Sequence, residues 1–396
     1  MASDTTAQET VAGRGAAAAV QGTVAEGFEG VREELAAVVA AEPHDPGVQL
    51  VAYVHGRQVV DLWAGEGMTG EALTAGYSLT KGMAHLVVAL LVQDGVLALD
   101  REVAYYWPEF AAEGKGAITL RELLSHRAGV IGVLGGFRPE ELADDRLLAQ
   151  RLAGIRPFWE PGAGFGYHAL VIGALTGEVV RRATGRSIQE LYEERVRAPH
   201  GLDFYLGLPE DRISRYVDIL PSLPTLEQSA ALAAAAPGPE SLTGIAFNRN
   251  ATPPTDLLEL GNDRRVHALG PASVGGVGNA RGLAAAYAAA IGELNGRARL
   301  LTPATVAEFS RRHSAGTDLV TGEEGHFGLG FEALGVTHPF LGEDAFGHSG
   351  ATGSQAFADP RSGVAYAYLR RRFAFPPGGG SPENSLLGAA VVRAAG

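Results

Sequence analysis

The chain shows its clearest strand patterns near its two ends and helical patterns between them. Near the N-terminus, 47–54 and 58–65 are rich in β-branched and aromatic residues, and a turn at His55-Gly56 separates them, which predicts an antiparallel hairpin. Strand patterns return after Gly325, at 327–334, 345–347, 354–358 and 364–369. We therefore expect an α+β fold in which strands from both termini form one antiparallel sheet.

Helical spacing of apolar residues occurs once before the first strands and repeatedly in the middle of the chain, at 24–41, 119–124, 167–184, 187–196 and 281–295. We divide the chain into a flexible N-terminus (1–22), a sheet-bearing part (23–80 and 325–396) and an inserted, mostly helical part (81–324). These parts interleave into one unit in which helices flank the sheet. The Ala- and Pro-rich stretch 220–262 predicts an irregular surface excursion.

The composition excludes several kinds of protein. With 46% hydrophobic and 19% charged residues among 396, the chain has the balance of a globular protein rather than a disordered one. Its net charge of -13 argues against nucleic acid as a partner, because phosphates attract clustered lysine and arginine. The run Arg370-Arg371-Arg372 is short enough to be a solvated strand end. The absence of cysteine excludes disulfides and thiolate catalysis.

The sequence indicates neither export nor a membrane. An acid, Asp4, stands where a secretion signal needs positive charge, and no continuous apolar segment follows it. No run approaches the roughly 18 apolar residues of a membrane-spanning helix. We therefore expect a cytoplasmic protein with no membrane partner.

The sequence offers no pattern for a metal or a cofactor. Its 11 histidines show neither H-x-H nor H-E-x-x-H spacing. The glycines of 275–280 lack the preceding strand and the final glycine of a dinucleotide-binding fingerprint, so they predict a turn before a helix. We expect no metal site and no cofactor.

Ser78 and Lys81 introduce the most apolar segment of the chain. The stretch 79–92 is apolar nearly all round, which is typical of a core helix, and Gly95 supplies a C-terminal cap. A helix places positions i and i+3 on one face, so the lysine amine can lie beside the serine hydroxyl. Desolvation would lower the pKa of Lys81 towards roughly 7 to 8, the range useful for a base. The alternative is an N-capping serine and a snorkelling lysine.

Two further segments carry candidate chemistry. Tyr167 follows the Pro- and Gly-rich loop 159–166 and opens a predicted helix, so its phenol either enters a cleft or packs as an aromatic anchor. The glycines around His348, Ser349 and Gly350 let a substrate approach the backbone, and a short strand edge offers N–H groups as an oxyanion hole. Ser349 nearly matches the nucleophile elbow G-x-S-x-G, but a strand follows it rather than a helix, which makes it the weaker nucleophile candidate.

Taken together, these three segments resemble the serine β-lactamase and penicillin-binding-protein superfamily, specifically its class C-like branch of family VIII carboxylesterases. The segment 118–129 is similar to that family's TLRDLLSHTSG, 161–185 to its PGT-x-x-x-Y helix, and 347–359 to its GHTG-x-x-G-x-x-x-x-AD strand pair. The likeness covers residues 25 to 395 and implies a β-lactamase-like fold.

The resemblance also implies roles for individual residues. Ser78 would be the acylated nucleophile, and Lys81 and Tyr167 would shuttle its proton, first as base and then as acid. The backbone N–H groups of Ser78 and Ala351 would form the oxyanion hole.

The chain departs from the β-lactamases of this superfamily at two positions. His348 stands where they carry the lysine of K-T-G, with Ser349 and Gly350 completing the substrate-binding segment, and Ala169 stands where they carry asparagine. The first change removes a cation that holds a β-lactam carboxylate, and the second removes an amide that contacts the acyl side chain. Both changes point away from antibiotic hydrolysis.

The sequence therefore predicts a serine hydrolase that cleaves a small-molecule carboxylic ester through an acyl-enzyme, with water as acceptor. An acyltransferase or amide-forming transacylase of secondary metabolism, with a small alcohol or amine as acceptor, uses the same residues and stays open. A β-lactamase or D,D-peptidase ranks third. The intact Ser78, Lys81 and Tyr167 argue against a non-enzymatic scaffold.

Overall fold

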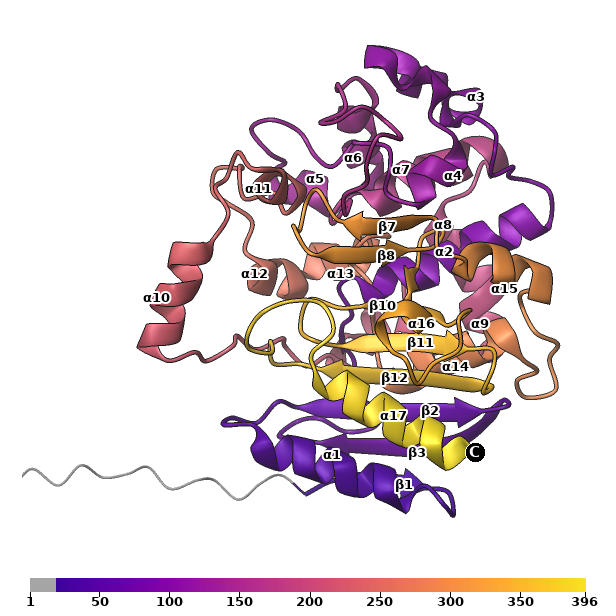
Figure 1. The fold of residues 1–396 in the computed structure, drawn as a ribbon, viewed down its shortest axis with the longest axis vertical. Coiled ribbons are helices and arrows are strands. Elements are labelled where there is room, and N and C mark those ends of the chain that lie inside the picture. Colours follow the sequence, from indigo (N-terminus) through magenta and orange to yellow (C-terminus); the bar gives the residue numbers. More distant parts are fainter. Residues whose placement is uncertain (1–18) are drawn as a thin grey trace, which may run out of the picture.

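The computed structural model describes residues 19–396, and an antiparallel sheet of nine strands is the centre of this part of the chain (Figure 1). In order across the sheet, the strands are β1 (Gln21–Val24), β3 (Arg57–Ala64), β2 (Val48–Val54), β12 (Val364–Arg370), β11 (Gln355–Asp359), β10 (Phe346–Ser349), β9 (Glu332–Ala333), β8 (Glu324–Phe327) and β7 (Ser314–Thr317). The two ends of the chain meet where β2 pairs with β12, from Val48 opposite Arg370 to Val54 opposite Val364. The predicted α+β fold, with one sheet from both termini, is confirmed.

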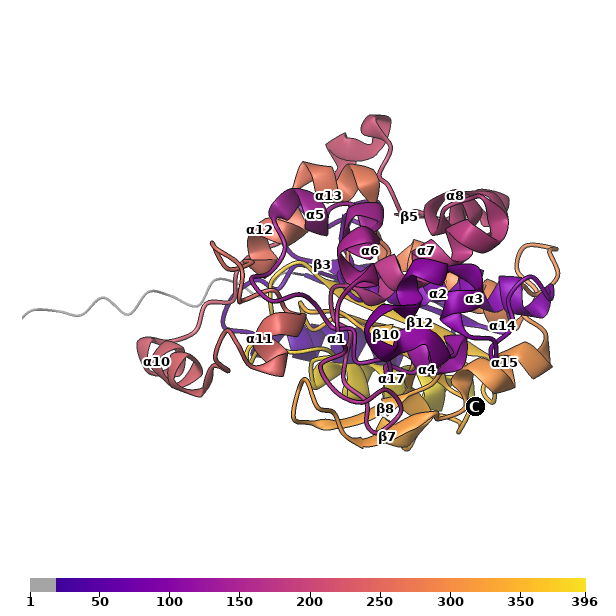
Figure 2. The same ribbon diagram turned by 90° about the horizontal axis from the view of Figure 1, so that it is seen from above.

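Helices cover both faces of this sheet (Figure 2). One face packs against α1 (Glu29–Ala41) and α17 (Glu383–Ala395), and the other against α2 (Leu79–Gln93) and α14 (Ala280–Ile291). Along β12, Tyr366 and Tyr368 enter the first layer, whereas Ala365 and Ala367 enter the second. Successive side chains of a strand point to opposite faces, so a strand with both faces covered has no polar side, and β12 is apolar until its last residue.

The inserted part is mostly helical, as expected. Its other helices are α3 (Val103–Tyr106), α4 (Leu120–Leu124), α5 (Pro139–Leu142), α6 (Asp145–Ala153), α7 (Ile172–Thr184), α8 (Ile188–Tyr192), α9 (Ala198–His200), α10 (Leu226–Ala235), α11 (Leu242–Ala246), α12 (Leu257–Asn262), α13 (Arg264–Leu269) and α15 (Pro303–Ser310), and α16 (Leu334–Thr337) follows β9. A small second sheet has the order β4 (Thr74–Ala75), β6 (Val277–Gly278) and β5 (Phe204–Tyr205). No helix between residues 19 and 396 has the length and apolar character needed to cross a bilayer.

The surface excursion predicted at 220–262 contains more regular structure than expected. Its most prominent element is α10, which stands away from the body of the protein and buries none of its residues (Figures 1 and 2). A capping box at Thr225 and Gln228 begins this helix. The run of alanines after it has high intrinsic helix propensity, which explains a helix without tertiary support.

Several predicted boundaries were wrong for local reasons. The predicted strand 327–334 contains only Phe327 of β8 and the two residues of β9, because Gly330 has a positive φ of 77° and turns the chain between these strands. The C-terminal part of the sheet begins at β7, before the predicted boundary at 325. Of the predicted flexible N-terminus 1–22, residues 1–18 lie outside the described part, and Gln21 and Gly22 belong to β1.

Arg370 corrects the prediction of a solvated basic strand end. Its side chain is only 1% exposed and forms ion pairs with Glu42, at 2.8 Å, and with Glu383. These carboxylates come from the end of α1 and the start of α17, so a cation at the end of β12 joins the two helices of one layer. A buried charge is tolerated here because it is paired on both sides.

Candidate active site

Ser78 lies at the turn that leads from β4 into α2, and this turn is held in a strained conformation. Tyr77 has a φ of 47°, a region that non-glycine residues rarely adopt. Its buried side chain donates a hydrogen bond to the Leu257 carbonyl at 2.7 Å and packs edge-on against Phe373. Ser78 is the N-cap residue of α2 but makes no capping hydrogen bond. Its hydroxyl is therefore left for other partners, which contradicts the reading of Ser78 as a simple capping residue.

Lys81 is fully buried in the first turn of α2 beside this hydroxyl. Its ammonium donates to Ser78 Oγ at 2.9 Å, to the Ala169 carbonyl at 2.7 Å and to the Ser273 carbonyl at 2.9 Å. Burial lowers the pKa of Lys81 to about 7, opposed in part by the negative charge of Glu332. A large fraction of the amine is therefore neutral near pH 7, and the two carbonyls keep it directed at the serine. The amine of Lys81 thus lies beside the serine hydroxyl, the position that the helical spacing predicts.

Tyr167 approaches the same hydroxyl from the other side. Its phenol donates to Ser78 Oγ at 2.8 Å, and its ring lies over Lys81, with the amine 4.9 Å from the ring centroid. The ring stacks on Phe327 of β8, with 5.8 Å between centroids and 7° between planes. Burial raises the pKa of Tyr167, so the phenol holds its proton at rest.

The backbone of Tyr167 is fixed by a residue that the sequence analysis did not single out. The buried carboxylate of Asp318 accepts a hydrogen bond from the Tyr167 N–H at 3.0 Å and others from Val320 and Thr321. Tyr167 does not open a helix as predicted, because α7 begins only at Ile172. No local pattern identifies Asp318, because the segment it holds lies far away in the sequence.

The turn after β10 lies against the start of α2, as an oxyanion hole requires. A Cβ on Gly350 would lie 2.9 Å from the Gly76 carbonyl oxygen, so only glycine permits this approach. Ala351 packs against the cluster that contains Tyr77. Within residues 19–396, the backbone N–H groups of Ser78 and Ala351 have no hydrogen-bond acceptor. Both are thus available to a ligand oxygen.

His348 and Ser349 lie at the same strand edge, together with an acid that the sequence analysis missed. His348 is buried, and burial together with the charge of Lys81 lowers its pKa to about 3, so the imidazole is neutral. Glu332 of β9 contacts both residues, with its carboxylate 3.2 Å from His348 Nδ1 and 2.8 Å from Ser349 Oγ. A single acid inside the apolar run 329–334 was the signal available in the sequence.

The sequence as a whole places the chain in a known family. The sequence model of the beta-lactamase family matches residues 32–388. The chain belongs to the beta-lactamase family. This membership confirms the resemblance inferred from the motifs, and the β-lactamase-like fold with it.

The family members most similar to this chain include proteins named as esterases. Esterase/beta-lactamase LipL of Mycobacterium tuberculosis is 30% identical over 343 residues, which cover 83% of this chain and 78% of LipL. Among solved structures, EstA of Arthrobacter nitroguajacolicus Rue61a is 41% identical with a TM-score of 0.85, covering 94% of this chain and 97% of EstA. A family VIII carboxylesterase is 34% identical with a TM-score of 0.82, covering 95% and 99%.

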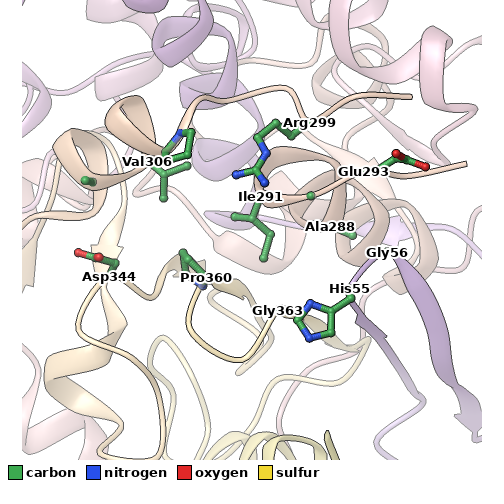
Figure 3. Close-up of a pocket in the computed structure, with 13 residues that line it drawn as sticks. His55, Gly56, Ala288, Ile291, Glu293, Arg299, Val306, Asp344, Pro360 and Gly363 are labelled. Atoms are coloured by element: carbon green, nitrogen blue, oxygen red, sulfur yellow. The ribbon is translucent and has the colours of Figure 1, made fainter. Parts of the chain in front are cut away.

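A pocket of about 420 Å³ lies apart from these residues (Figure 3). It is formed at the C-terminal end of α14, where Ile291 meets Val306 of α15, His55 of the β2–β3 turn and Pro360 of the β11–β12 turn. Ser78, Lys81 and Tyr167 are not among its lining residues. This pocket therefore does not mark the candidate catalytic residues, which are identified by the hydrogen bonds of Ser78.

Proposed function

We propose that this protein hydrolyses small-molecule carboxylic esters through an acyl-enzyme on Ser78. The observation that carries the proposal is the pair of hydrogen bonds that Ser78 Oγ receives, from Lys81 at 2.9 Å and Tyr167 at 2.8 Å. A serine becomes a nucleophile when a base next to it has a pKa near the working pH, and the pKa of Lys81 is about 7. The names of the similar family VIII carboxylesterase and of esterase/beta-lactamase LipL support the choice of ester as substrate.

Acylation follows from these contacts. Neutral Lys81 takes the hydroxyl proton of Ser78 while Oγ forms a bond to the ester carbonyl carbon, and the carbonyl becomes an oxyanion. The N–H groups of Ser78 and Ala351 donate to that oxyanion. The ester C–O bond then breaks, and the phenol of Tyr167 gives its proton to the departing alcohol. Lys81 then returns its extra proton to Tyr167 through water, because the acylated Ser78 oxygen carries no proton to relay.

Deacylation reverses the proton movements. Water attacks the acyl carbonyl and loses a proton to neutral Lys81, the same oxyanion hole holds the second tetrahedral intermediate, and Ser78 regains its proton as the carboxylic acid leaves. An alcohol in place of water yields a new ester instead, which is the acyl-transfer alternative. The two outcomes differ only in the acceptor.

The test is hydrolysis of a chromogenic short-chain ester such as p-nitrophenyl butyrate. We expect Ser78→Ala to abolish turnover, because no other hydroxyl contacts both Lys81 and Tyr167 within residues 19–396. Ser229→Ala, on the exposed face of α10, is the matched control and is expected to retain wild-type activity. Mass spectrometry of the intact protein after treatment with a fluorophosphonate should show one adduct in the wild type and none in Ser78→Ala. Turnover that survives in folded Ser78→Ala would overturn the proposal.

A further inference from the structure

The strand edge beside Ser78 has an unusual arrangement of hydrogen-bond donors around Glu332. The carboxylate accepts from the Ser349 N–H at 3.0 Å and from the Ser349 hydroxyl at 2.8 Å. His348 Nδ1 lies 3.2 Å from the same carboxylate and 2.9 Å from the Ser349 carbonyl. Both of these neighbours are acceptors, so Nδ1 carries the imidazole proton. One acid thus occupies the donors of both residues.

The remaining polar atom of this strand edge, Nε2 of His348, is a hydrogen-bond acceptor. With its proton on Nδ1, the neutral imidazole of His348 presents an unprotonated Nε2, which is buried and has no hydrogen-bond partner within residues 19–396. The side chain of Glu332 is 22% exposed. Gly380 packs against the hydroxyl of Ser349, because a Cβ built on this glycine would lie 2.9 Å from the hydroxyl oxygen.

Glu332 faces the reacting groups rather than the far side of the sheet. It lies directly opposite Phe327 in the β8–β9 pair, and cross-strand partners share a face of a sheet. Phe327 is the residue on which the Tyr167 ring stacks. The negative charge also acts on both groups that contact Ser78, since it raises the pKa of Lys81 and of Tyr167.

Lys81 offers no hydrogen-bond donor to an incoming anion. Its nitrogen faces Ser78 Oγ and the Ala169 and Ser273 carbonyls, so in the neutral and the charged form alike no N–H is free for a substrate carboxylate. A carboxylate placed at the 348–350 edge therefore meets occupied donors, an unpaired acceptor and a like charge. A hydroxyl placed there meets acceptors for its proton and no opposing charge.

We infer that Glu332 is a specificity-determining residue that excludes esters carrying a carboxylate beside the scissile bond and favours those carrying a hydroxyl. The inference rests on the proposed esterase function and adds the substrate class to it. Discrimination of this kind comes from the repulsive element at least as much as from the new attraction.

Three acetate esters of phenols with similar leaving-group basicity test the inference: phenyl acetate, 3-(hydroxymethyl)phenyl acetate and 3-carboxyphenyl acetate. For the wild type we expect kcat/KM to favour the hydroxymethyl ester over the carboxylate ester by about tenfold or more. Glu332→Gln keeps the size of the side chain and removes its charge, and should reduce this preference by about tenfold. Glu332→Asp keeps the charge and should retain most of the preference.

Glu343→Gln is the matched control. Glu343 is exposed and has no ion pair within the described residues, so this variant loses one negative charge from the same region and should keep the wild-type preference. An unchanged preference in Glu332→Gln, with phenyl acetate still cleaved, would overturn the inference and leave the esterase proposal intact. Equal use of the two substituted esters by the wild type would do the same without any variant. If the wild type cleaved none of the three esters, the esterase proposal would be overturned as well.

Discussion

Lys81 shows how one residue acquires its chemistry from its surroundings. An amine in water has a pKa near 10.5, and full burial in α2 brings that of Lys81 to about 7. The negative charge of Glu332 limits the shift, and two fixed carbonyls, from Ala169 and Ser273, set the direction of the amine. Burial in a core helix destabilises the charged form of Lys81, and the resulting low pKa makes its amine a suitable base at neutral pH.

This pKa predicts the pH dependence of activity. Only neutral Lys81 accepts the serine proton, so kcat/KM for an uncharged ester should rise as pH increases through about 7 and then reach a plateau. His348 and Tyr167 do not titrate there: the pKa of His348 is about 3, and burial raises that of Tyr167 above its ordinary value. The pKa of Glu332 lies above its ordinary value, because burial raises it by more than its two hydrogen bonds from Ser349 lower it.

The measurement is a pH profile of kcat/KM with p-nitrophenyl butyrate, together with a check that the protein stays folded over the range. Lys81→Met should lose activity by about 10² to 10⁴ and lose the limb near pH 7 with it. A profile that is flat from about pH 6 to about pH 8 would contradict the assignment of Lys81 as the base.

Among single residues, the sequence predicted those whose role can be read from their close neighbours in the chain. Ser78 and Lys81 stand three positions apart at the start of an apolar helix, and burial of that helix is readable from its composition. Asp318 and Glu332 act on residues distant in sequence, through hydrogen bonds to Tyr167 and Ser349. Such contacts depend on how the elements pack, and no spacing rule within a single sequence encodes them.

Among the elements, α2 depends on a glycine whose role runs against helix propensity. Gly82 follows Lys81 inside the helix, where alanine is ordinarily the better residue by up to about 1 kcal/mol. A Cβ on Gly82 would lie 2.2 Å from the Tyr287 hydroxyl of α14. The glycine therefore lets α14 pack closely against the helix that carries Ser78 and Lys81.

Gly82→Ala should accordingly destabilise the protein, by about 1 to 3 kcal/mol, because the core must shift to admit the methyl group. Gly177→Ala is the matched control: Gly177 lies inside α7, and its added Cβ would come no closer than 3.9 Å to a neighbour. That change should be neutral or should stabilise by up to about 1 kcal/mol. Urea unfolding followed by circular dichroism measures both, and a stabilised Gly82→Ala would refute the steric argument.

The elements also show where prediction from sequence reached its limit. The uniformly apolar stretch 79–92 predicts α2 almost to the residue, and Gly95 follows it with a φ of 73°. The predicted helix 167–184 begins late, at Ile172, because Asp318 holds the backbone of Tyr167 in a turn. Where local propensity and a distant hydrogen bond compete, the sequence displays only the first.

Across the whole molecule, strands from opposite ends of the chain pair in one sheet, where β2 lies beside β12. The positions of the strand and helix patterns along the sequence were enough to predict this pairing of the two ends. The ion pairs of Arg370 were not predictable, because Arg370 stands in a basic run typical of a solvated strand end. Its side chain is instead enclosed between Glu42 and Glu383. Strand β12, the end of α1 and the start of α17 thus share one buried ion cluster.

Removing the cation alone should destabilise the fold more than a typical surface change. Arg370→Met leaves the carboxylates of Glu42 and Glu383 close together, and loss of one partner from a buried ion pair costs about 3 to 5 kcal/mol. Arg393→Met, at an exposed site on α17, is the control and should change the free energy of unfolding by no more than about 0.5 kcal/mol. Adding Glu383→Gln to Arg370→Met should restore part of the loss, because one uncompensated charge disappears. Urea unfolding at neutral pH decides the matter: equal stability of the two single variants would mean that the cluster does not hold the ends of the chain together.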